Sequence, residues 1–301
     1  LYTRLLLARE LLSQKGSVFI QISDENVHHA RELLDEVFGA KNFMSLISFR
    51  TKIPLNAAFL PNTADYLLWY AKDRENVKFR RLFLLRGFGE NTQFTWIRLL
   101  DGTDRKMTRD EINDPSILPK GARLFRLTDL KATGYTATCH FDFELEGKIY
   151  SPSKANSWKT TPDGMRKLIE ANRIKVQGNT PAYVFFYDDY PVQEPTNQWT
   201  DTQGAIGKIY AVQTAEKVVQ RCLLMTTDPG DLVLDPTCGS GSTTFVAEQW
   251  GRRWITCDTS RVAITIAKQR LMTSQFDFYE LAHPGEGIQS GFRYRTVPHI
   301  T

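Results

Sequence analysis

The first part of the chain alternates between helical and extended patterns of hydrophobic positions. Leucines within residues 1–14 recur close to the period of about 3.6 residues that marks a helix, and the apolar run 17–22 predicts a buried strand. A second apolar stripe predicts a helix with Ser23 as its N-cap and Phe38 near its end. Two further strands are predicted at 46–50 and 66–70. This order of elements is typical of an α/β domain.

The middle of the chain lacks this regular alternation. From about residue 73 to residue 207 the pattern breaks into short pieces punctuated by Gly, Pro, Asn and Asp. One helix is predicted there, at 163–172, because Thr161-Pro162-Asp163 has the composition of a helix start. We interpret 73–207 as an inserted domain of the α+β type.

Regular α/β patterning returns at Ile209. The elements predicted after it are a helix at 216–225, a strand at 231–234, a helix at 243–250, a strand at 254–257 and a helix at 261–272. Their short spacing is typical of a doubly wound sheet.

Composition narrows the class of protein. Hydrophobic residues make up 42% of the 301 residues, and no apolar run approaches the roughly 20 residues that span a bilayer. The cysteines Cys139, Cys222, Cys238 and Cys257 form no Cys-x-x-Cys pair, which argues against a zinc site or a disulfide framework and predicts a cytoplasmic protein. Residues 73–159 hold sixteen basic and twelve acidic side chains, and so carry an excess equal to the net charge of +4. This mild excess permits a polyanionic partner without requiring one, and a nucleic acid, if bound, is expected to bind there.

The segment with the strongest chemical signal runs from Asp231 to Thr244. A strand leads into a turn with two glycines and then into a helix, an arrangement that brings backbone N–H groups and a helix N-terminus close to a ligand. Seventeen residues after Gly241, the next strand ends at Asp258, roughly where a doubly wound fold places a carboxylate for ribose hydroxyls. The pattern predicts a nucleotide-type loop.

Three ligands compete for this loop. The phosphates of a nucleotide bound by a P-loop are excluded, because no Gly-Lys-Ser/Thr follows the glycines. A dinucleotide fingerprint would place a third small residue at the position of Thr244, which weakens NAD and leaves a nicotinamide-dependent oxidoreductase as a less favoured alternative. Asp235 can accept a hydrogen bond from a ligand ammonium, a group that S-adenosylmethionine has and NAD lacks. S-adenosylmethionine is therefore the favoured cofactor.

At this point the sequence resembles a family. Residues 235–244, Asp-Pro-Thr-Cys-Gly-Ser-Gly-Ser-Thr-Thr, are similar to the Asp-Pro-Phe-x-Gly-Ser-Gly-Thr-Thr cofactor motif of site-specific DNA amino-methyltransferases. Residues 251–258 and 212–217 resemble the neighbouring cofactor segments, and 4–12, 16–26 and 64–72 resemble the modification subunits of type III restriction systems. The order of these segments is that of the beta class, and the matches cover 1–72 and 208–275.

The resemblance implies a fold and a division of the chain. The fold is a doubly wound, Rossmann-like methyltransferase sheet interrupted by an inserted α+β target-recognition domain. Residues 1–72 are then the catalytic half, 73–207 the insert and 208–301 the cofactor-binding half. The implied cofactor-binding residues are Asp235, Pro236, Cys238, Gly239, Gly241 and Asp258, with Gln213 and Thr214 as weaker candidates.

The family's catalytic motif, Asp/Asn/Ser-Pro-Pro-Tyr/Phe, binds the exocyclic amino group of a base flipped from the duplex. No Pro-Pro pair occurs in the sequence, so we expect the motif upstream of Leu1 and no catalytic residue in this chain. The resemblance implies methylation of the 6-amino group of adenine in double-stranded DNA, a homodimer and a restriction subunit as partner. A DNA- or S-adenosylmethionine-binding module without catalysis remains an alternative.

The insert supplies the candidate DNA contacts. Basic residues, including Arg86 and Arg126, alternate there with aromatic residues, which is also the composition of an ordinary solvated surface. The position of the insert in the resembling architecture favours DNA. The predicted contacts are Arg80, Arg81, Arg105, Lys106, Lys148 and Lys159.

Overall fold

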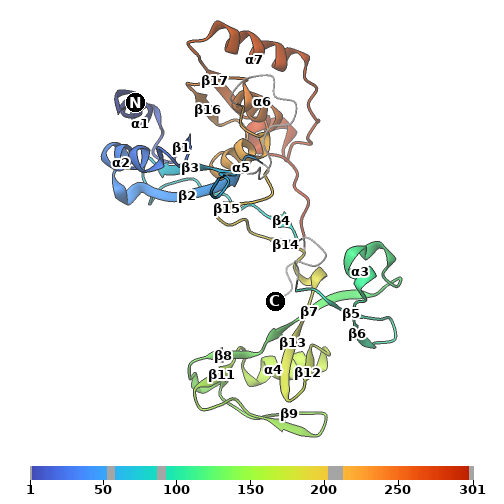
Figure 1. Ribbon diagram of the computed structural model, residues 1–301. Helices are drawn as coiled ribbons and strands as arrows, with labels where there is room; N and C mark the ends of the chain where they lie inside the picture. Colours follow the sequence, from blue (N-terminus) through green and yellow to red (C-terminus); the bar gives the residue numbers. More distant parts are fainter. Residues whose placement is uncertain (1, 53–57, 87–92, 203–212, 298–301) are drawn as a thin grey trace. The chain divides into compact units, whose positions relative to one another are not determined.

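The computed structural model describes residues 2–52, 58–86, 93–202 and 213–297 of the chain. They form two compact units (Figure 1). The first unit comprises Leu1–Leu84 and Glu194–Arg295, and the second Leu85–Gln193 and Thr296–Thr301. The continuous part of the second unit lies inside the insert predicted at 73–207, whose role in target recognition stays a prediction.

The first unit contains a four-stranded mixed sheet in the order β1-β3-β2-β15. Its strands are β1 (Ser17–Ile22), β2 (Phe43–Arg50), β3 (Ala64–Ala71) and β15 (Gln198–Trp199). Strand β3 pairs antiparallel with both β1 and β2, whereas β15 pairs parallel with β2. Strand β3 is therefore central, and five consecutive residues at its C-terminal end are buried.

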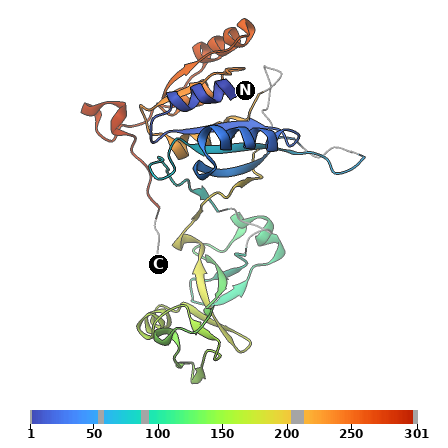
Figure 2. The same cartoon turned by 90° about the vertical axis from the view of Figure 1, so that its left-hand side faces the viewer.

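Helices cover both faces of this sheet. Leu68 and Tyr70 of β3 belong to the same core cluster as residues of α1 (Tyr2–Leu11) and α2 (Val27–Phe38), and Figure 2 shows α2 lying across the strands. The alternate residues Leu67 and Trp69 pack with α5 (Glu216–Thr226) on the opposite face. The period of two along β3 thus places successive side chains in two different cores.

The rest of the first unit is a βαβ unit followed by a helix. Its elements are β16 (Leu232–Asp235), α6 (Ser242–Gln249), β17 (Arg253–Thr256) and α7 (Arg261–Thr273). Strands β16 and β17 pair parallel, with Asp235 opposite Thr256 at their C-terminal ends. Leu223 of α5 packs with Val233 of β16 and Val246 of α6, so α5 connects this unit to the four-stranded sheet.

The second unit is built on a five-stranded antiparallel sheet in the order β12-β13-β7-β5-β6. These strands are β5 (Trp96–Arg98), β6 (Asp104–Lys106), β7 (Arg123–Asp129), β12 (Ile174–Gln177) and β13 (Thr180–Phe186). Two antiparallel pairs accompany it, β8 (Lys131–Thr133) with β11 (Asn156–Trp158) and β9 (Phe143–Leu145) with β10 (Lys148–Tyr150). The short strands β4 (Leu84–Leu85) and β14 (Val192–Gln193) lie where the chain passes between the units.

Two helices belong to the second unit, α3 (Arg109–Asn113) and α4 (Pro162–Glu170). Helix α4 has Thr161 as its N-cap and Pro162 in its first turn, as the sequence predicts. Met165 of α4 packs with Trp158, Phe143 and other buried side chains in the core beneath the two antiparallel pairs. Short 3-10 helices in the chain lie at Ala40–Asn42, Pro115–Ile117, Ala137–Cys139, Tyr187–Asp189, Pro284–Glu286 and Ile288–Ser290.

The mixed α/β fold class predicted from the sequence is confirmed. The start of α2 is a correction: its N-cap is Asn26 and not Ser23, and the helix begins at Val27. Asp24, which would be the first helical residue after an N-cap at Ser23, instead accepts a hydrogen bond from Asn62 Nδ2 at 2.8 Å. The predicted return of regular patterning at Ile209 lies outside the described residues. No helix in the described part of the chain is long and apolar enough to cross a bilayer.

Candidate functional site

The predicted cofactor loop connects the end of β16 to the start of α6. Hydrogen bonds to the end of β17 hold its backbone, with Cys238 N donating to Cys257 O at 3.0 Å and Cys257 N to Asp235 O at 3.1 Å. Gly241 N then donates to Cys238 O at 2.8 Å and closes a tight turn. The two parallel strands therefore define the loop together.

The side chain of Asp258, which follows β17, connects the segment after β17 to the glycine turn after β16. Its Oδ2 accepts from Gly239 N at 2.9 Å, and its Oδ1 accepts from Ser260 N at 2.8 Å. The hydrogen bonds from Ser260 and Gly239 hold the pKa of the Asp258 carboxyl below its ordinary value. Asp258 is thus an anion that orders the loop, and its remaining lone pairs are available to ligand hydroxyls.

Asp235 is the last residue of β16 and so lies at the start of the loop. Its Oδ1 accepts from Thr237 N at 2.9 Å and from Thr237 Oγ1 at 3.1 Å, which leaves Oδ2 without a hydrogen bond among the described residues. Pro236 and Thr237, which follow Asp235, are exposed. The carboxylate therefore has an acceptor available for a cationic group of a ligand.

The glycines of the loop serve the turn and the packing behind it. Gly239 and Gly241 both have positive φ, 50° and 73°. A Cβ atom on Gly241 would lie 2.7 Å from the Cβ atom of Ala267 in α7, so this position requires glycine for close helix packing. Gly241 is also the N-cap of α6 and has no side chain to bond the first N–H groups of that helix. These N–H groups are left to other acceptors, including an anionic ligand group.

The side chains of Cys238 and Thr244 are buried. Cys238 is 4% exposed, and burial raises the pKa of its thiol. Thr244 is 1% exposed and donates from Oγ1 to Gly241 O at 2.9 Å. Cys238 therefore contributes to the loop through its backbone and by packing.

Sequence reasoning missed Arg270, which supports the loop from α7. Its Nη1 donates to Ser240 O and to Ser242 Oγ, both at 3.3 Å, and its Nη2 donates to Glu216 Oε1 at 2.5 Å. The guanidinium also lies 4.5 Å from the ring centroid of Phe245. A basic residue in the last turn of a helix is common, so nothing in the local sequence distinguishes Arg270 from a helix-capping cation.

Thr214, a weaker cofactor candidate, lies beside the four-stranded sheet. Its Oγ1 donates to Gln21 Oε1 of β1 at 2.5 Å, and Gln21 Nε2 donates to Asp65 Oδ2 of β3 at 3.2 Å. Gln213, the residue before Thr214, is likewise not without an interaction partner. The assignment of both residues to the cofactor stays a prediction.

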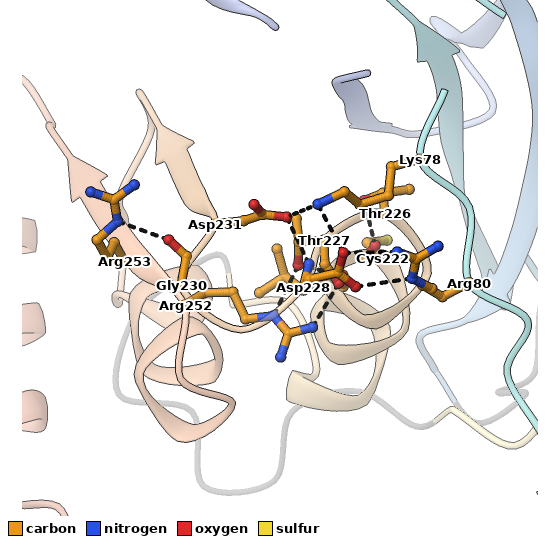
Figure 3. Close-up of polar contacts among 11 residues, drawn as sticks. Lys78, Arg80, Cys222, Thr226, Thr227, Asp228, Gly230, Asp231, Arg252 and Arg253 are labelled. Carbon is orange, nitrogen blue, oxygen red and sulfur yellow. Dashed lines mark hydrogen bonds and ion pairs between the residues drawn. The ribbon is translucent and has the colours of Figure 1, made fainter. Parts of the chain in front are cut away.

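A second polar cluster fixes the segment before β16 (Figure 3). Lys78 forms ion pairs with Asp228 and Asp231, and Arg80 forms a bidentate pair with Asp228 through two contacts of 2.9 Å. Arg252 is 5% exposed and donates to Thr227 Oγ1 at 3.0 Å and to Thr227 O at 2.7 Å. These contacts connect the chain after β3 to the N-terminal ends of β16 and β17. The glycine loop lies at the opposite, C-terminal ends of these strands.

The predicted DNA contacts divide into paired and unpaired cations. Arg80 pairs with Asp228 as above, Arg81 Nη1 pairs with Glu194 Oε1 at 2.9 Å, and Arg105 forms a bidentate pair with Glu111 at 2.6 and 2.8 Å. Within the described ranges, Lys106, Lys148 and Lys159 are exposed and have no carboxylate within 4.0 Å. Charge already neutralised by a carboxylate is less available to a phosphate, so the lysines are the better candidates.

The Arg105–Glu111 pair predicts an acid-dependent stability of the second unit. Hydrogen bonds from Arg105 and from the Thr108 backbone lower the pKa of Glu111 from 4.5 to about 2. The stabilising contribution of a carboxyl with a lowered pKa is complete above the unfolded value and is lost as pH falls through the folded one. In Glu111→Gln, the loss of stability relative to wild type should therefore be largest above pH 4.5 and shrink toward pH 2.

The measurement is the urea midpoint of both proteins between those two pH values. Glu170→Gln, which removes the same charge from an exposed ion pair with Arg166 on α4, is the control. A difference between wild type and Glu111→Gln that stays constant over this range would contradict the role of the charge.

Comparison with known proteins decides the family. The model of the DNA methylase family, of the N6/N4 methyltransferase type, matches residues 1–269. The chain belongs to this family. Its members are methyltransferases that use S-adenosylmethionine, so the family and cofactor predicted from residues 235–244 are confirmed at that level, and the nicotinamide alternative is disfavoured.

The curated relatives extend beyond the matched region. The chain is 28% identical over 276 residues to the type II methyltransferase M.EcaI of Enterobacter cloacae, a match that covers 89% of this chain and 55% of that protein. It is 23% identical over 322 residues to the probable type III restriction-modification enzyme HindVI Mod subunit of Haemophilus influenzae, covering 89% and 42%. The crystal structure of the M1.HpyAVI–SAM complex is 12% identical with a TM-score of 0.43, covering 90% of this chain and 81% of that one. The chain thus spans about half the length of the curated relatives it matches.

Proposed function

We propose that the protein containing this chain transfers a methyl group from S-adenosylmethionine to the exocyclic amino group of a base in DNA, within a restriction-modification system. The observation that carries the proposal is the loop between β16 and α6, where Asp258 holds Gly239 N at 2.9 Å. Membership of the DNA methylase family supports the same reaction.

The residues of the loop fit S-adenosylmethionine group by group. The Asp258 carboxylate would accept from the ribose hydroxyls, and the Asp235 carboxylate would accept from the ammonium. The N–H groups at the start of α6 suit a carboxylate, because the N-cap Gly241 provides no competing side chain. When bound, the cofactor supplies the methyl group as a sulfonium.

The target is proposed to be the 6-amino group of adenine. Support comes from the resemblance of 4–12, 16–26 and 64–72 to type III modification subunits and from the similarity to the HindVI Mod subunit. An aryl amine is a poor nucleophile, so the reaction depends on in-line positioning and on acceptors for the amino protons rather than on a strong base. A cytoplasmic location, a homodimer and a restriction subunit as partner remain predictions.

Calorimetric titration with S-adenosylhomocysteine tests the cofactor proposal. We expect micromolar binding to the 301-residue chain and none with NAD under the same conditions. Absence of S-adenosylhomocysteine binding by a chain with native circular dichroism would overturn the assignment of the loop.

Nucleoside analysis of treated DNA tests the target. The full gene product is incubated with S-adenosylmethionine and duplex DNA, and the digested nucleosides are analysed by mass spectrometry. We expect N6-methyladenine, whereas N4-methylcytosine would overturn the adenine proposal. S-adenosylhomocysteine binding without any methylated base would instead favour the alternative of a binding module.

A further inference from the structure

Two arginines of the second unit lie against one aromatic ring. The guanidinium carbon of Arg126, in β7, lies 5.2 Å from the ring centroid of Phe185 and 5.3 Å from that of Phe94. The guanidinium carbon of Arg86 lies 5.9 Å from the same Phe185 centroid. Two cations are therefore brought together on one side of the sheet.

Neither arginine has an acidic partner within the part of the chain that the structure describes. Arg126 Nη1 donates to Gln93 Oε1 at 2.8 Å, and Arg86 Nε donates to Tyr190 O at 3.0 Å, so both acceptors are neutral. Arg126 Nε is buried and has no hydrogen-bond partner among the described residues. Counting only the described residues, the Arg126 Nε–H has no acceptor and neither guanidinium group faces a carboxylate.

Most other arginines of this unit have an acidic partner. Arg98, Arg105, Arg123 and Arg173 each lie between 2.5 and 2.9 Å from a carboxylate oxygen, whereas Arg109 has no ion pair among the described residues. Burial, and then repulsion from Arg86, lower the pKa of Arg126. Two cations held partly out of water destabilise the protein unless an anion lies between them, and guanidinium groups bind phosphate oxygens in bidentate geometry.

We propose that Arg86 and Arg126 form a phosphate-binding site that takes a phosphodiester of the DNA backbone. This inference rests on the proposed function, because it names DNA as the source of the phosphate. Contacts to phosphates fix the position and register of a protein on a duplex without reading its sequence. The site therefore contributes affinity for any duplex rather than specificity for one sequence.

Duplex binding by charge-removing variants tests the site. The 301-residue chain is titrated into a fluorescent random duplex of about 30 base pairs at several KCl concentrations, with anisotropy as the readout. Arg126→Met and Arg86→Met keep an apolar stem against Phe185 and are each expected to weaken binding about 5-fold to 10-fold and to reduce the salt slope by about one. Arg166→Met removes an exposed charge paired with Asp163 and Glu170 on α4, and its affinity should stay within about 2-fold of wild type.

Thermal unfolding without DNA distinguishes this site from a structural role. Because the two guanidinium groups repel each other, Arg126→Met should not lower Tm at low salt. If Arg126→Met fails to fold, Arg86→Met and the charge-preserving Arg126→Lys carry the test, with Arg126→Lys expected to keep the wild-type salt slope.

Inorganic phosphate distinguishes the two sources of the anion. At constant ionic strength it should raise the Tm of wild type, but not of Arg86→Met, and compete with the duplex. Stabilisation by phosphate with unchanged duplex affinity in the variants would overturn DNA as the source. Wild-type duplex binding with neither effect would overturn the site and leave the proposed function intact. Absence of duplex binding by the wild-type chain would overturn the site, and absence of duplex binding by the full gene product as well would overturn DNA as the substrate.

Discussion

Replacing Gly241 with alanine is expected to lower the free energy of unfolding by about 2–4 kcal/mol. The residue has φ of +73°, and an alanine Cβ would lie 2.7 Å from Ala267 Cβ and 3.1 Å from Ala267 Cα. Left-handed backbone strain contributes about 1–2 kcal/mol of this loss and overpacking against α7 the remainder. Urea unfolding followed by circular dichroism measures the effect, and S-adenosylhomocysteine affinity should fall with it because the same turn forms the cofactor loop.

Gly147 provides a control for the backbone part of this substitution. It has φ of +76°, and with Glu146 (φ of +51°) it forms the two-residue turn between β9 and β10; a Cβ on Gly147 would meet nothing within 4 Å. Gly147→Ala therefore reports left-handed backbone strain without a close contact and is expected to cost about 1–2 kcal/mol. Equal losses for the two glycines would contradict the close approach of the loop to α7.

A double-mutant cycle identifies the contact itself. Ala267→Gly removes the methyl group nearest to the new Cβ, although it also costs about 1 kcal/mol of helix propensity on its own. Its cost should be smaller in the Gly241→Ala background than in wild type, since it relieves the clash there. Additive effects would show that the strain of Gly241→Ala lies elsewhere.

Periodic hydrophobic patterns predicted most elements of the first unit correctly. Strand β1 matches its predicted bounds at Ser17–Ile22, and α5, α6, β17 and α7 match theirs to within one or two residues. The helices bury one stripe of side chains and the strands bury side chains on alternate positions, so the period of each element is visible in the sequence. The start of α2 was wrong because Asn62, far along the chain, bonds the carboxylate of Asp24 that would otherwise lie in a first turn.

The charged residues of the candidate DNA surface were harder to interpret. The alternation of basic and aromatic residues predicts Arg80 as a DNA contact, yet Asp228, 148 residues away, forms a bidentate pair with it. Such a partner is set by tertiary packing and leaves no local signal. The pair between Arg105 and Glu111 did have one, because Thr108 and Glu111 form a capping box whose spacing can be read from the sequence.

The cofactor loop shows the same division between local and long-range information. Two glycines between a strand and a helix, with Asp258 after the next strand, were sufficient to predict a nucleotide-type loop. In the structure, Gly241 is required by its φ of +73° and by the close approach of Ala267 behind the loop, and the sequence motif shows neither cause. Arg270, 28 residues after Ser242, supports the loop through contacts that no spacing rule predicts.

Asp258→Ala is expected to weaken S-adenosylhomocysteine binding by at least about 100-fold. The substitution removes the acceptor proposed for the ribose hydroxyls. It also releases Gly239 N, so the loop is no longer held in one conformation before the ligand binds. Calorimetry of both proteins at neutral pH measures the change.

Asp101→Ala is the control for the local turn. Asp101 Oδ1 accepts from Thr103 N at 2.8 Å, the same i to i+2 contact and distance as between Asp258 Oδ1 and Ser260 N. Loss of this turn in the second unit should leave cofactor affinity unchanged. A comparable loss of affinity in both variants would show that the effect is a general loss of stability and not one of the cofactor loop.

The pH dependence of binding separates the charge of Asp258 from its hydrogen bonds. Because the pKa of its carboxyl lies below the ordinary value of 3.8, Asp258 stays ionised through neutral and mildly acidic pH, and its contribution is lost only as pH falls below that value. S-adenosylhomocysteine affinity of wild type should therefore be constant between about pH 5 and pH 7. A decrease in affinity within that range, absent in Asp258→Asn, would mean that the carboxyl titrates at a raised pKa. The hydrogen bonds from Gly239 and Ser260 would then not be formed in solution, and Asp258 would not be the group that orders the loop.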